Sequence, residues 1–344
     1  MLELDSLAEL EPALREERFF GCRGCVARVY IGYRASENLR RGSAPNPPEP
    51  CRLPAVAVSI ERSGSSDPVP GTFSVGAWSR TWTDAEYAAA IDVVRCAIRN
   101  GEVYQANLVQ HLSADFSGDP AGLADRLRGL RPLEPRAMVG DGWSIACASP
   151  ELFLSRRGDR VRTSPIKGTR PAGVAIASDK DTAEHVMIVD LERNDLARVC
   201  RPGTVRWPER IEERELAGVN HLASTVEGTL RAGIGLTELL EAIFPGGSVT
   251  GAPKVAALDL IAQLEPVGRG ASMGALGKVQ PNGDLDLALT IRTFAIADGR
   301  IHLWVGGGIV WDSIAESEIE ESWVKARPLL RAIGSAIPAE ALLS

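Results

Sequence analysis

Apolar and polar residues alternate most regularly in the C-terminal third of the chain. In the segment LDLALTIRTFAI (285–296), every second position from Leu285 to Ile291 is apolar, whereas Arg292 falls on the opposite face. This alternation predicts a half-buried β-strand. The Asp298-Gly299 pair is typical of a hairpin turn and leads into a second apolar run over residues 301–305. The two strands are therefore expected to pair antiparallel.

Three other segments have the spacing of helices. Thr83 and Glu86 form a capping box, and apolar residues follow at helical spacing until Gly101 ends the helix. A second helix is predicted over residues 180–199. A third is predicted over residues 253–264, because a proline at its start suits the first turn of a helix.

The remaining predicted elements are short strands. Strand-like runs occupy residues 143–148, 152–155 and 160–163, and another lies at residues 53–60 between two turn-rich stretches. The rest of the first eighty residues is predicted to be irregular, since Gly, Pro and Ser interrupt any long element there. Strands and helices come in clusters rather than in strict alternation. This favours an α+β fold over a parallel barrel.

Composition and charge restrict the class of partner. The 344 residues are 44% hydrophobic and 24% charged, which is typical of a globular protein that can bury a sizeable core. A net charge of −7 argues against general affinity for nucleic acid or anionic lipid, although a basic pocket would still accept a small anion. No apolar run reaches the roughly 20 residues that span a bilayer, and the acidic first residues differ from a basic signal peptide. A cytoplasmic protein without membrane contact is expected.

The chain has six cysteines, and Cys22 and Cys25 form a C-x-x-C motif. Such a pair can begin a zinc site or a redox site. No second C-x-x-C and no paired histidine follows at ligand spacing. All six are therefore interpreted as free thiols in a reducing compartment.

Two pairs of acidic residues are spaced so that both carboxylates project from one side of a helix. Asp181 and Glu184 are three residues apart on the second predicted helix, and Glu318 and Glu321 repeat this spacing near the C-terminus. Together the four would form an oxygen-rich site suited to Mg²⁺. For either pair taken alone, a solvated helix face remains the alternative.

Two glycine-rich segments are candidates for contact with an anion. The segment FPGGSVTGAPK (244–254) leads directly into a helix, so its backbone N–H groups and the helix dipole would suit a carboxylate or phosphate. Its spacing is not that of a P-loop. The run Gly306–Gly308 follows a strand and would let a ligand approach the backbone closely. Two ordinary tight turns are the alternative.

Two single cations are further candidates. Lys167 lies in PIKGTR (165–170), where a preceding proline and a following Gly-Thr turn would hold its side chain in a pocket. Burial or neighbouring cations would lower its pKa and make the free amine a nucleophile. A solvated surface lysine is the alternative. Arg292 lies within a predicted strand, where its charge needs either an ion-pair partner or an anionic ligand.

Taken together, these motifs resemble those of the chorismate-utilising enzymes, a family that includes the large subunits of anthranilate synthase and aminodeoxychorismate synthase. The similar segments occur in family order from about residue 80 to the end of the chain. They are GEVYQANLVQ (101–110), SPELFL (149–154), PIKGTRP (165–171), DTAEHVMIVDLERNDLARV (181–199), HLASTVEG (221–228), FPGGSVTGAPK (244–254), GALG (274–277), TIRT (290–293) and GGGIVWDSIAESEIEES (306–322).

The resemblance implies a fold and a division of the chain. The family fold has two largely antiparallel β-sheets packed face to face, with helices on the outside. Residues 81–344 would form the chorismate-binding catalytic domain. Residues 1–80 would be a shortened N-terminal region that belongs to the same α/β body.

The resemblance also implies a role for each candidate residue. The acidic pairs would surround a Mg²⁺ that holds the ring carboxylate of chorismate, with Glu184 and Glu321 as the nearest ligands and Asp181 and Glu318 beside them. Arg292 matches an arginine that binds the pyruvyl carboxylate. The other positions similar to substrate-contacting groups of the family are Thr169, His221, Thr250, Gly306, Gly307, Gly308 and Lys325.

Lys167 decides which reaction the resemblance implies. Anthranilate synthases resemble PIAGT at this motif, whereas aminodeoxychorismate synthases resemble PIKGT, as in this chain. Lys167 would attack C2 of the ring and expel the C4 hydroxyl, while Glu151 protonates that leaving group. Ammonia would then add at C4 and expel the lysine, giving 4-amino-4-deoxychorismate. The implied function is aminodeoxychorismate synthase component I, which serves 4-aminobenzoate and folate synthesis.

A partner and several alternatives follow from the same resemblance. The chain has no amidotransferase signature, so a separate glutamine amidotransferase subunit is expected to supply the ammonia. Ser272 stands where the family often has a substrate-contacting tyrosine. The alternatives are an anthranilate synthase component, an isochorismate or salicylate synthase, and a non-catalytic chorismate-binding homologue. An amine transfer that serves a secondary metabolite fits the residues equally well.

Overall fold

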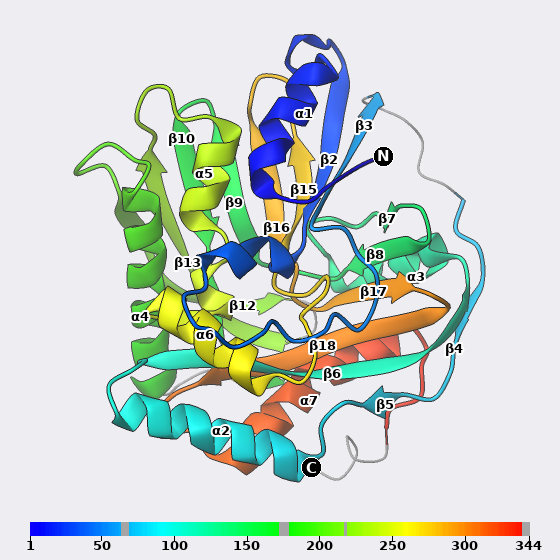
Figure 1. Cartoon of the computed structure of the whole chain (residues 1–344), viewed down its shortest axis with the longest axis vertical. Helices are drawn as coiled ribbons and strands as arrows, with labels where there is room; N and C mark the ends of the chain where they lie inside the picture. The colour runs from blue at the N-terminus through cyan, green and yellow to red at the C-terminus, as the bar shows by residue number, and fades with distance from the viewer. Residues whose placement is uncertain (63–68, 172–178, 217–218, 339–344) are drawn as a thin grey trace.

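Two antiparallel sheets form the body of the protein in its computed structural model, which describes residues 1–62, 69–171, 179–216 and 219–338 (Figure 1). Within these residues the larger sheet has ten strands. Their order is β1 (Leu2–Leu4), β3 (Val56–Arg62), β2 (Cys25–Ile31), β15 (Ala275–Val279), β16 (Leu285–Leu289), β9 (Leu152–Arg157), β10 (Arg160–Ser164), β13 (Val219–Thr229) and β11 (Ile166–Pro171), with β12 (Arg206–Leu216) paired to β13.

The smaller sheet has eight strands in the described part of the chain. Their order is β14 (Gly251–Ala252), β6 (Gln105–Gly118), β18 (Arg300–Ile309), β17 (Thr293–Ala297), β8 (Trp143–Cys147) and β7 (Met138–Val139), with β4 (Phe73–Val75) and β5 (Ser79–Arg80) paired to β6. In Figure 1 the strands β2, β9, β10, β15 and β16 of the larger sheet run nearly upright, whereas β6 and β18 run nearly across the view. The two sheets therefore cross at a steep angle.

Helices cover the outer faces of the sheets. They are α1 (Leu10–Glu16), α2 (Asp84–Arg99), α3 (Pro120–Leu127), α4 (Asp179–Ala197), α5 (Leu236–Ile243), α6 (Lys254–Leu264) and α7 (Ala315–Ala332). The predicted capping box is confirmed at the start of α2, where Thr83 Oγ1 accepts from the Glu86 N–H at 3.2 Å. No helix in the described ranges combines the length and the apolar character that a bilayer crossing requires.

The main core lies between the two sheets. Val29 and Leu154 of the larger sheet belong to the same buried cluster as Ile145 and Trp304 of the smaller sheet. On its other side the smaller sheet packs against α7 and α3 through a second cluster that includes Trp323. Two sheets share one apolar layer and helices lie outside it, so the expected α+β fold is confirmed.

The predicted strand over residues 285–296 is wrong in one respect. β16 ends at Leu289 in the larger sheet, and β17 begins at Thr293 in the smaller sheet. Arg292 lies in the break with a left-handed backbone (φ +51°), so it is not in mid-strand. The predicted hairpin at Asp298-Gly299 is confirmed, since Ala297 pairs with Arg300. The chain therefore crosses from one sheet to the other at Arg292.

The first eighty residues are more regular than predicted. β2 pairs with β15 along its whole length, and β3 pairs with β2, so both strands extend the larger sheet. The predicted run at residues 53–60 corresponds to β3, but β1 and β2 were not expected. The pairing partner of β2 lies near residue 277, and a local sequence pattern does not indicate so distant a contact.

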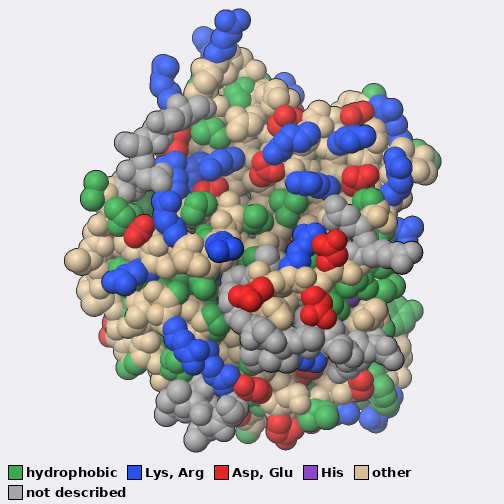
Figure 2. Space-filling model, turned by 180° about the vertical axis from the view of Figure 1, so that it is seen from behind, with side chains coloured by type: hydrophobic (Ala, Val, Ile, Leu, Met, Phe, Trp, Pro, Cys, Tyr) green, Lys and Arg blue, Asp and Glu red, His purple; other side chains and the backbone are tan. Residues whose placement is uncertain are grey.

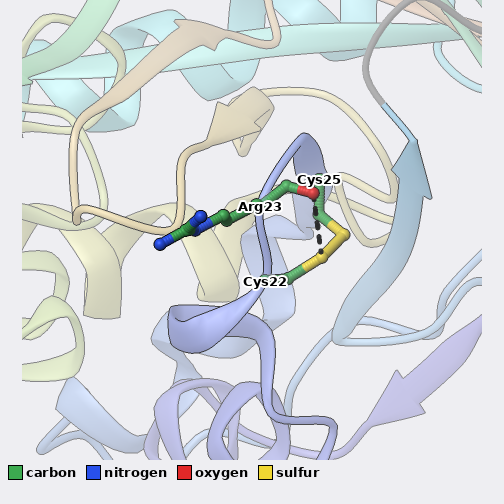
Figure 3. Close-up of a disulfide and its surroundings, with 3 residues drawn as sticks. All are labelled: Cys22, Arg23 and Cys25. Atoms are coloured by element: carbon green, nitrogen blue, oxygen red, sulfur yellow. Dashed lines mark hydrogen bonds between the residues drawn. A yellow bond between two sulfur atoms is a disulfide. The ribbon is translucent and has the colours of Figure 1, made fainter.

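The prediction that Cys22 and Cys25 are free thiols is wrong. The two sulfurs are bonded to each other, as Figure 3 shows. The short turn between them places their Cα atoms 5.8 Å apart, within the separation that a disulfide spans. Among the described cysteines, Cys51, Cys96, Cys147 and Cys200 are free as predicted.

Charged side chains of both signs cover the face that is turned away in Figure 1. Figure 2 shows Lys and Arg side chains interspersed with Asp and Glu over its upper half. Exposed ion pairs such as Arg157–Asp286, with nitrogen and oxygen 2.5 Å apart, join neighbouring strands of the larger sheet. Such exposed pairs contribute little to stability, typically about 1 kcal/mol or less.

Candidate active site

A cavity of about 540 Å³ opens where the two sheets, α4 and α7 meet. Its size is that of a small-molecule site. Ten of the residues singled out from the sequence lie in its wall, and they come from seven separate segments of the chain. They are Glu151, Lys167, Glu184, His221, Arg292, Gly306, Gly308, Glu318, Glu321 and Lys325.

Lys167 lies on β11, an edge strand of the larger sheet. The pairing register of β11 against β13 shifts directly after Lys167, and Gly168 has a left-handed backbone (φ +63°). Lys167 Nζ donates to the carbonyl of Ser248 at 3.0 Å. Burial lowers the pKa of Lys167, and the charge of Lys325 acts in the same direction. The charge of Glu184 acts in the opposite direction, but the net shift of the pKa is downward and increases the share of the free amine, which is the nucleophilic form.

Glu151 lies directly before β9 and is 4% exposed. Burial raises the pKa of its carboxyl to about 7. The hydroxyl of Ser248 donates to Glu151 Oε1 at 2.7 Å. Ser248 thus contacts both functional groups, through its hydroxyl to the acid and through its carbonyl to the amine. A carboxyl with this pKa is suited to general acid catalysis near neutral pH.

The glycine-rich segment 244–254 carries Ser248 and so holds it beside Lys167 and Glu151. The backbone N–H groups of this segment were expected to face a bound anion. The N–H of Gly247 instead donates to Glu192 Oε1 at 3.1 Å, so a carboxylate of the protein itself accepts this hydrogen bond. Thr250 is fully buried, and its hydroxyl donates to the carbonyl of Gly246 at 3.0 Å. Thr250 therefore stabilises the turn and lies outside the cavity wall. The segment presents Ser248 rather than a row of free N–H groups.

Arg292 and His221 form a buried pair on one side of the cavity. Arg292 Nη2 contacts His221 Nε2, and His221 Nδ1 lies 2.6 Å from the carbonyl of Gly168. This geometry requires a neutral imidazole that donates through Nδ1 and accepts through Nε2. Burial and the neighbouring guanidinium lower the pKa of His221 to about 2. His221 thus orients Arg292, whose charge faces a cavity that could hold a carboxylate.

The carboxylates of α7 and the glycines of β18 face one another. A methyl group on Gly307 would lie 3.3 Å from Glu318 Oε2 and 3.4 Å from Glu321 Oε1. Lys325 Nζ pairs with Glu321 Oε1 at 2.8 Å and donates to the carbonyl of Gly306 at 2.6 Å. Gly307 is outside the cavity wall but borders this acidic cluster.

The donor chemistry of the cluster fits a hard divalent cation. Burial and the negative charges of Glu321 and Glu184 raise the pKa of Glu318 to about 7. This mutual repulsion is what a bound cation would relieve. The described carboxylates do not by themselves make up a metal site of three or more ligands. The side chain of the fourth predicted ligand, Asp181, lies outside the described set.

One predicted substrate-contacting residue has a side chain outside the described set, and two residues of the cavity wall were not predicted. The side chain of Thr169 is not among those described. Ser272 is fully buried, and its hydroxyl has no hydrogen-bond partner in the described ranges. Ser248 and Asn107 lie in motifs that resemble those of the family, and both line the cavity, although neither was predicted as a site residue.

Comparison with known proteins identifies a family that matches most of the chain. Residues 22–331 match a family described as chorismate binding enzyme. The chain is 40% identical over 283 residues to anthranilate synthase component 1 of Thermus thermophilus, covering 77% of this chain and 61% of that protein. It is 36% identical over 272 residues to aminodeoxychorismate synthase component 1 of Bacillus subtilis, covering 76% and 58%.

A solved structure is also similar. The anthranilate synthase component I of Streptococcus pneumoniae aligns with a TM-score of 0.74 at 27% identity, covering 89% of this chain and 80% of that chain. The chain spans about three fifths of the length of the curated relatives that it matches.

Proposed function

The chain belongs to the family of chorismate binding enzymes, and from this premise we propose that it acts as component I of an aminodeoxychorismate synthase. It would convert chorismate and ammonia to 4-amino-4-deoxychorismate and water. The observation that carries the proposal is the placement of Lys167, whose amine lies in the cavity beside Glu151 and has a lowered pKa. A lysine so placed is suited to covalent catalysis.

The proposed reaction has two displacements. In the first, the free amine of Lys167 bonds to ring C2, the two ring double bonds shift, and the C4 hydroxyl leaves. Protonated Glu151 gives its proton to this hydroxyl, which departs as water. In the second, ammonia bonds to C4, the double bonds shift back, and Lys167 leaves as the free amine. The new ammonium group returns one proton to Glu151, so both residues regain their starting state.

The substrate is a dianion, and the cavity offers charges that complement it. Arg292, oriented by His221, would bind the pyruvyl carboxylate. Lys325 and the backbone at Gly306 would lie near the ring carboxylate. Glu184 and Glu321, with Asp181 and Glu318 beside them, would hold a Mg²⁺, which when bound would offset the negative charge of that carboxylate.

The proposed ammonia source is a separate glutamine amidotransferase subunit. Two of the similar proteins are named as component 1 of their synthases, which supports the existence of a partner component. Anthranilate synthase is the second candidate function. The 40% identity to the Thermus thermophilus protein favours it.

A product assay tests the proposed function. The protein is incubated with chorismate, Mg²⁺ and an ammonium salt, and the products are separated by chromatography and identified by mass. We expect 4-amino-4-deoxychorismate, formed only when ammonium is present. Anthranilate as the product would support the second candidate, and salicylate or isochorismate would contradict both amination reactions. Glutamine in place of ammonium should give no product from this chain alone.

Gly308→Ala is expected to lower kcat/KM for chorismate. The added methyl group would lie 2.0 Å from Gln105 Nε2 and 3.3 Å from Lys167 Nζ, so the Gln105 amide must move and the Lys167 amine is crowded in its position. Displacing a reacting group by about 1 Å typically lowers the rate by roughly tenfold to a hundredfold. Gly129→Ala is the matched control, because a methyl group there meets nothing within 4 Å. Equal activity of the two variants would show that the space beside Lys167 is not used.

A further inference from the structure

The disulfide between Cys22 and Cys25 joins two residues that are already close in the chain. Cys22 follows the short helix η2 (Phe19–Gly21), and Cys25 is the first residue of β2. The bond therefore closes a small ring that contains Arg23 and Gly24. The stability that a disulfide contributes decreases as the closed loop becomes shorter. This cross-link joins no distant parts of the fold, so its contribution to stability is small.

The two sulfurs lie where an external thiol can approach them. Cys22 and Cys25 are half-buried, and the neighbouring Gly21, Arg23 and Gly24 are exposed. Neither cysteine lies in the wall of the cavity. Exchange requires a thiolate to reach one sulfur of the disulfide, so access decides which cysteines react. Three of the described free cysteines are buried instead, namely Cys51, Cys147 and Cys200.

The turn that brings the sulfurs together is held by contacts other than the bond between them. The N–H of Cys22 donates to the carbonyl of Phe19 at 2.9 Å, and Cys25 is paired with Arg62 of β3. Gly24 has a left-handed backbone (φ +72°), which glycine adopts without strain. The Cα atoms of the two cysteines are 5.8 Å apart. After reduction the two thiols would therefore stay side by side, ready to form the disulfide again.

A cation lies beside one of the two sulfurs. Arg62 is directly opposite Cys25 in the pairing of β3 with β2, and directly opposed side chains lie on the same face of a sheet with Cβ atoms about 5 Å apart. A positive charge there stabilises a thiolate at Cys25. Arg23 differs, because its side chain extends away from the sulfurs in Figure 3. Cys25 is therefore the better leaving group, and Cys22 is the sulfur that an external thiolate would attack.

We propose that Cys22 and Cys25 form a site of thiol–disulfide exchange that accepts two electrons from a dithiol. One thiolate of the dithiol bonds to Cys22 Sγ, and Cys25 leaves as a thiolate. The second thiolate of the dithiol then bonds to the first sulfur of the dithiol, and Cys22 leaves as a thiolate. The dithiol is oxidised to a disulfide, and the two cysteines take up the two protons that it releases. The site is separate from the chorismate cavity, so this inference does not rest on the proposed function.

Alkylation of the folded protein tests the exchange. Protein purified in air is incubated with excess dithiothreitol without denaturant, labelled with N-ethylmaleimide and digested, and the labelled peptides are identified by mass. Before reduction we expect label on the exposed Cys96 but not on Cys22 or Cys25. After reduction all three should be labelled. Glutathione disulfide, added once dithiothreitol is removed, should return Cys22 and Cys25 to the unlabelled state, and thermal unfolding should show a folded protein throughout.

The direction of attack is tested with a single thiol and with two variants. Glutathione has no second thiol, so brief exposure followed by N-ethylmaleimide should leave glutathione on Cys22 and maleimide on Cys25. Arg62→Gln should lower the rate constant for reduction by about threefold, because the departing thiolate loses its neighbouring charge. Arg23→Gln is the matched control, since it removes the same charge from a side chain that points away from the sulfurs. It should keep the wild-type rate constant.

The outcomes decide between an exchange site and its alternatives. If Cys22 and Cys25 stayed unlabelled in dithiothreitol until the protein unfolded, the disulfide would be a structural cross-link. If both were labelled before reduction and again after glutathione disulfide, they would be free thiols. Either result would overturn the exchange site, and both are measured on the wild type, so an unfolded variant does not affect them. Glutathione on Cys25, or an unchanged rate constant in Arg62→Gln, would overturn the assignment of Cys22 as the attacked sulfur.

Discussion

Lys167→Ala is expected to abolish the formation of 4-amino-4-deoxychorismate, lowering kcat by roughly ten-thousandfold or more, as the loss of a covalent nucleophile does in other enzymes. The physical reason is that Lys167 Nζ is the amine held by the carbonyl of Ser248, whose hydroxyl also holds Glu151, so its loss removes the nucleophile beside the acid. The measurement is the product assay with saturating ammonium. In the wild type, rapid quenching should trap a protein adduct whose mass exceeds that of the free chain by chorismate less one water.

Lys278→Ala is the matched control for this experiment. Lys278 lies on β15, its side chain is 41% exposed, and it pairs with Glu134 at 3.5 Å. It lies outside the cavity wall, so its loss should leave the turnover unchanged. If Lys167→Ala still aminated chorismate at the wild-type rate, the covalent mechanism would be wrong. Binding of chorismate by an inactive Lys167→Ala variant would show that the cavity itself is intact.

Local sequence patterns predicted elements that depend on neighbouring residues. The capping box at Thr83, the hairpin at Asp298-Gly299 and the strand from Leu285 were all found, because each is determined by residues a few positions apart. The crossing at Arg292 was missed. The alternation of apolar residues continues to Ile291, and no local pattern indicates that the strand leaves one sheet and joins the other.

The site was predicted as a set of residues but not as a geometry. Motifs carried by the family resemblance pointed to Lys167, Glu151 and Arg292, and the fold brings all three to one cavity. The role of Ser248 was not predicted. It lies 81 residues from Lys167 and 97 residues from Glu151 in the sequence, so its two hydrogen bonds arise only from the packing of the sheets. For the same reason the pairing of His221 with Arg292 was not predicted.

The arrangement around Ser248 explains how one cavity can hold an acid and a free amine. Burial acts in opposite directions on the two groups, raising the pKa of Glu151 and lowering that of Lys167. Their mutual attraction would favour the charged pair. Ser248 offers each a hydrogen bond from an uncharged group, which gives both side chains a fixed position without requiring them to be ionised.

Glu151→Gln is expected to lower kcat by about a thousandfold, because general acid catalysis typically contributes between a hundredfold and ten-thousandfold. The carboxyl must be protonated to act, and burial raises its pKa to about 7. The protonated fraction therefore falls as the pH rises through 7, and the wild-type rate should fall with it on the alkaline side. A glutamine cannot titrate, so the residual activity of the variant should lack this alkaline decrease. Rates measured between pH 6 and pH 9 at saturating ammonia test both expectations.

Glu49→Gln is the matched control for the pH dependence. Burial raises the pKa of Glu49 to about 7 as well, but its carboxylate accepts from the N–H of Gly270 and lies outside the cavity wall. If the alkaline decrease came from the general stability of the fold, removing either carboxyl would alter it similarly. We expect Glu49→Gln to keep both the wild-type kcat and the decrease above pH 7. A Glu151→Gln variant with the wild-type pH profile would exclude Glu151 as the acid and require another donor for the departing hydroxyl.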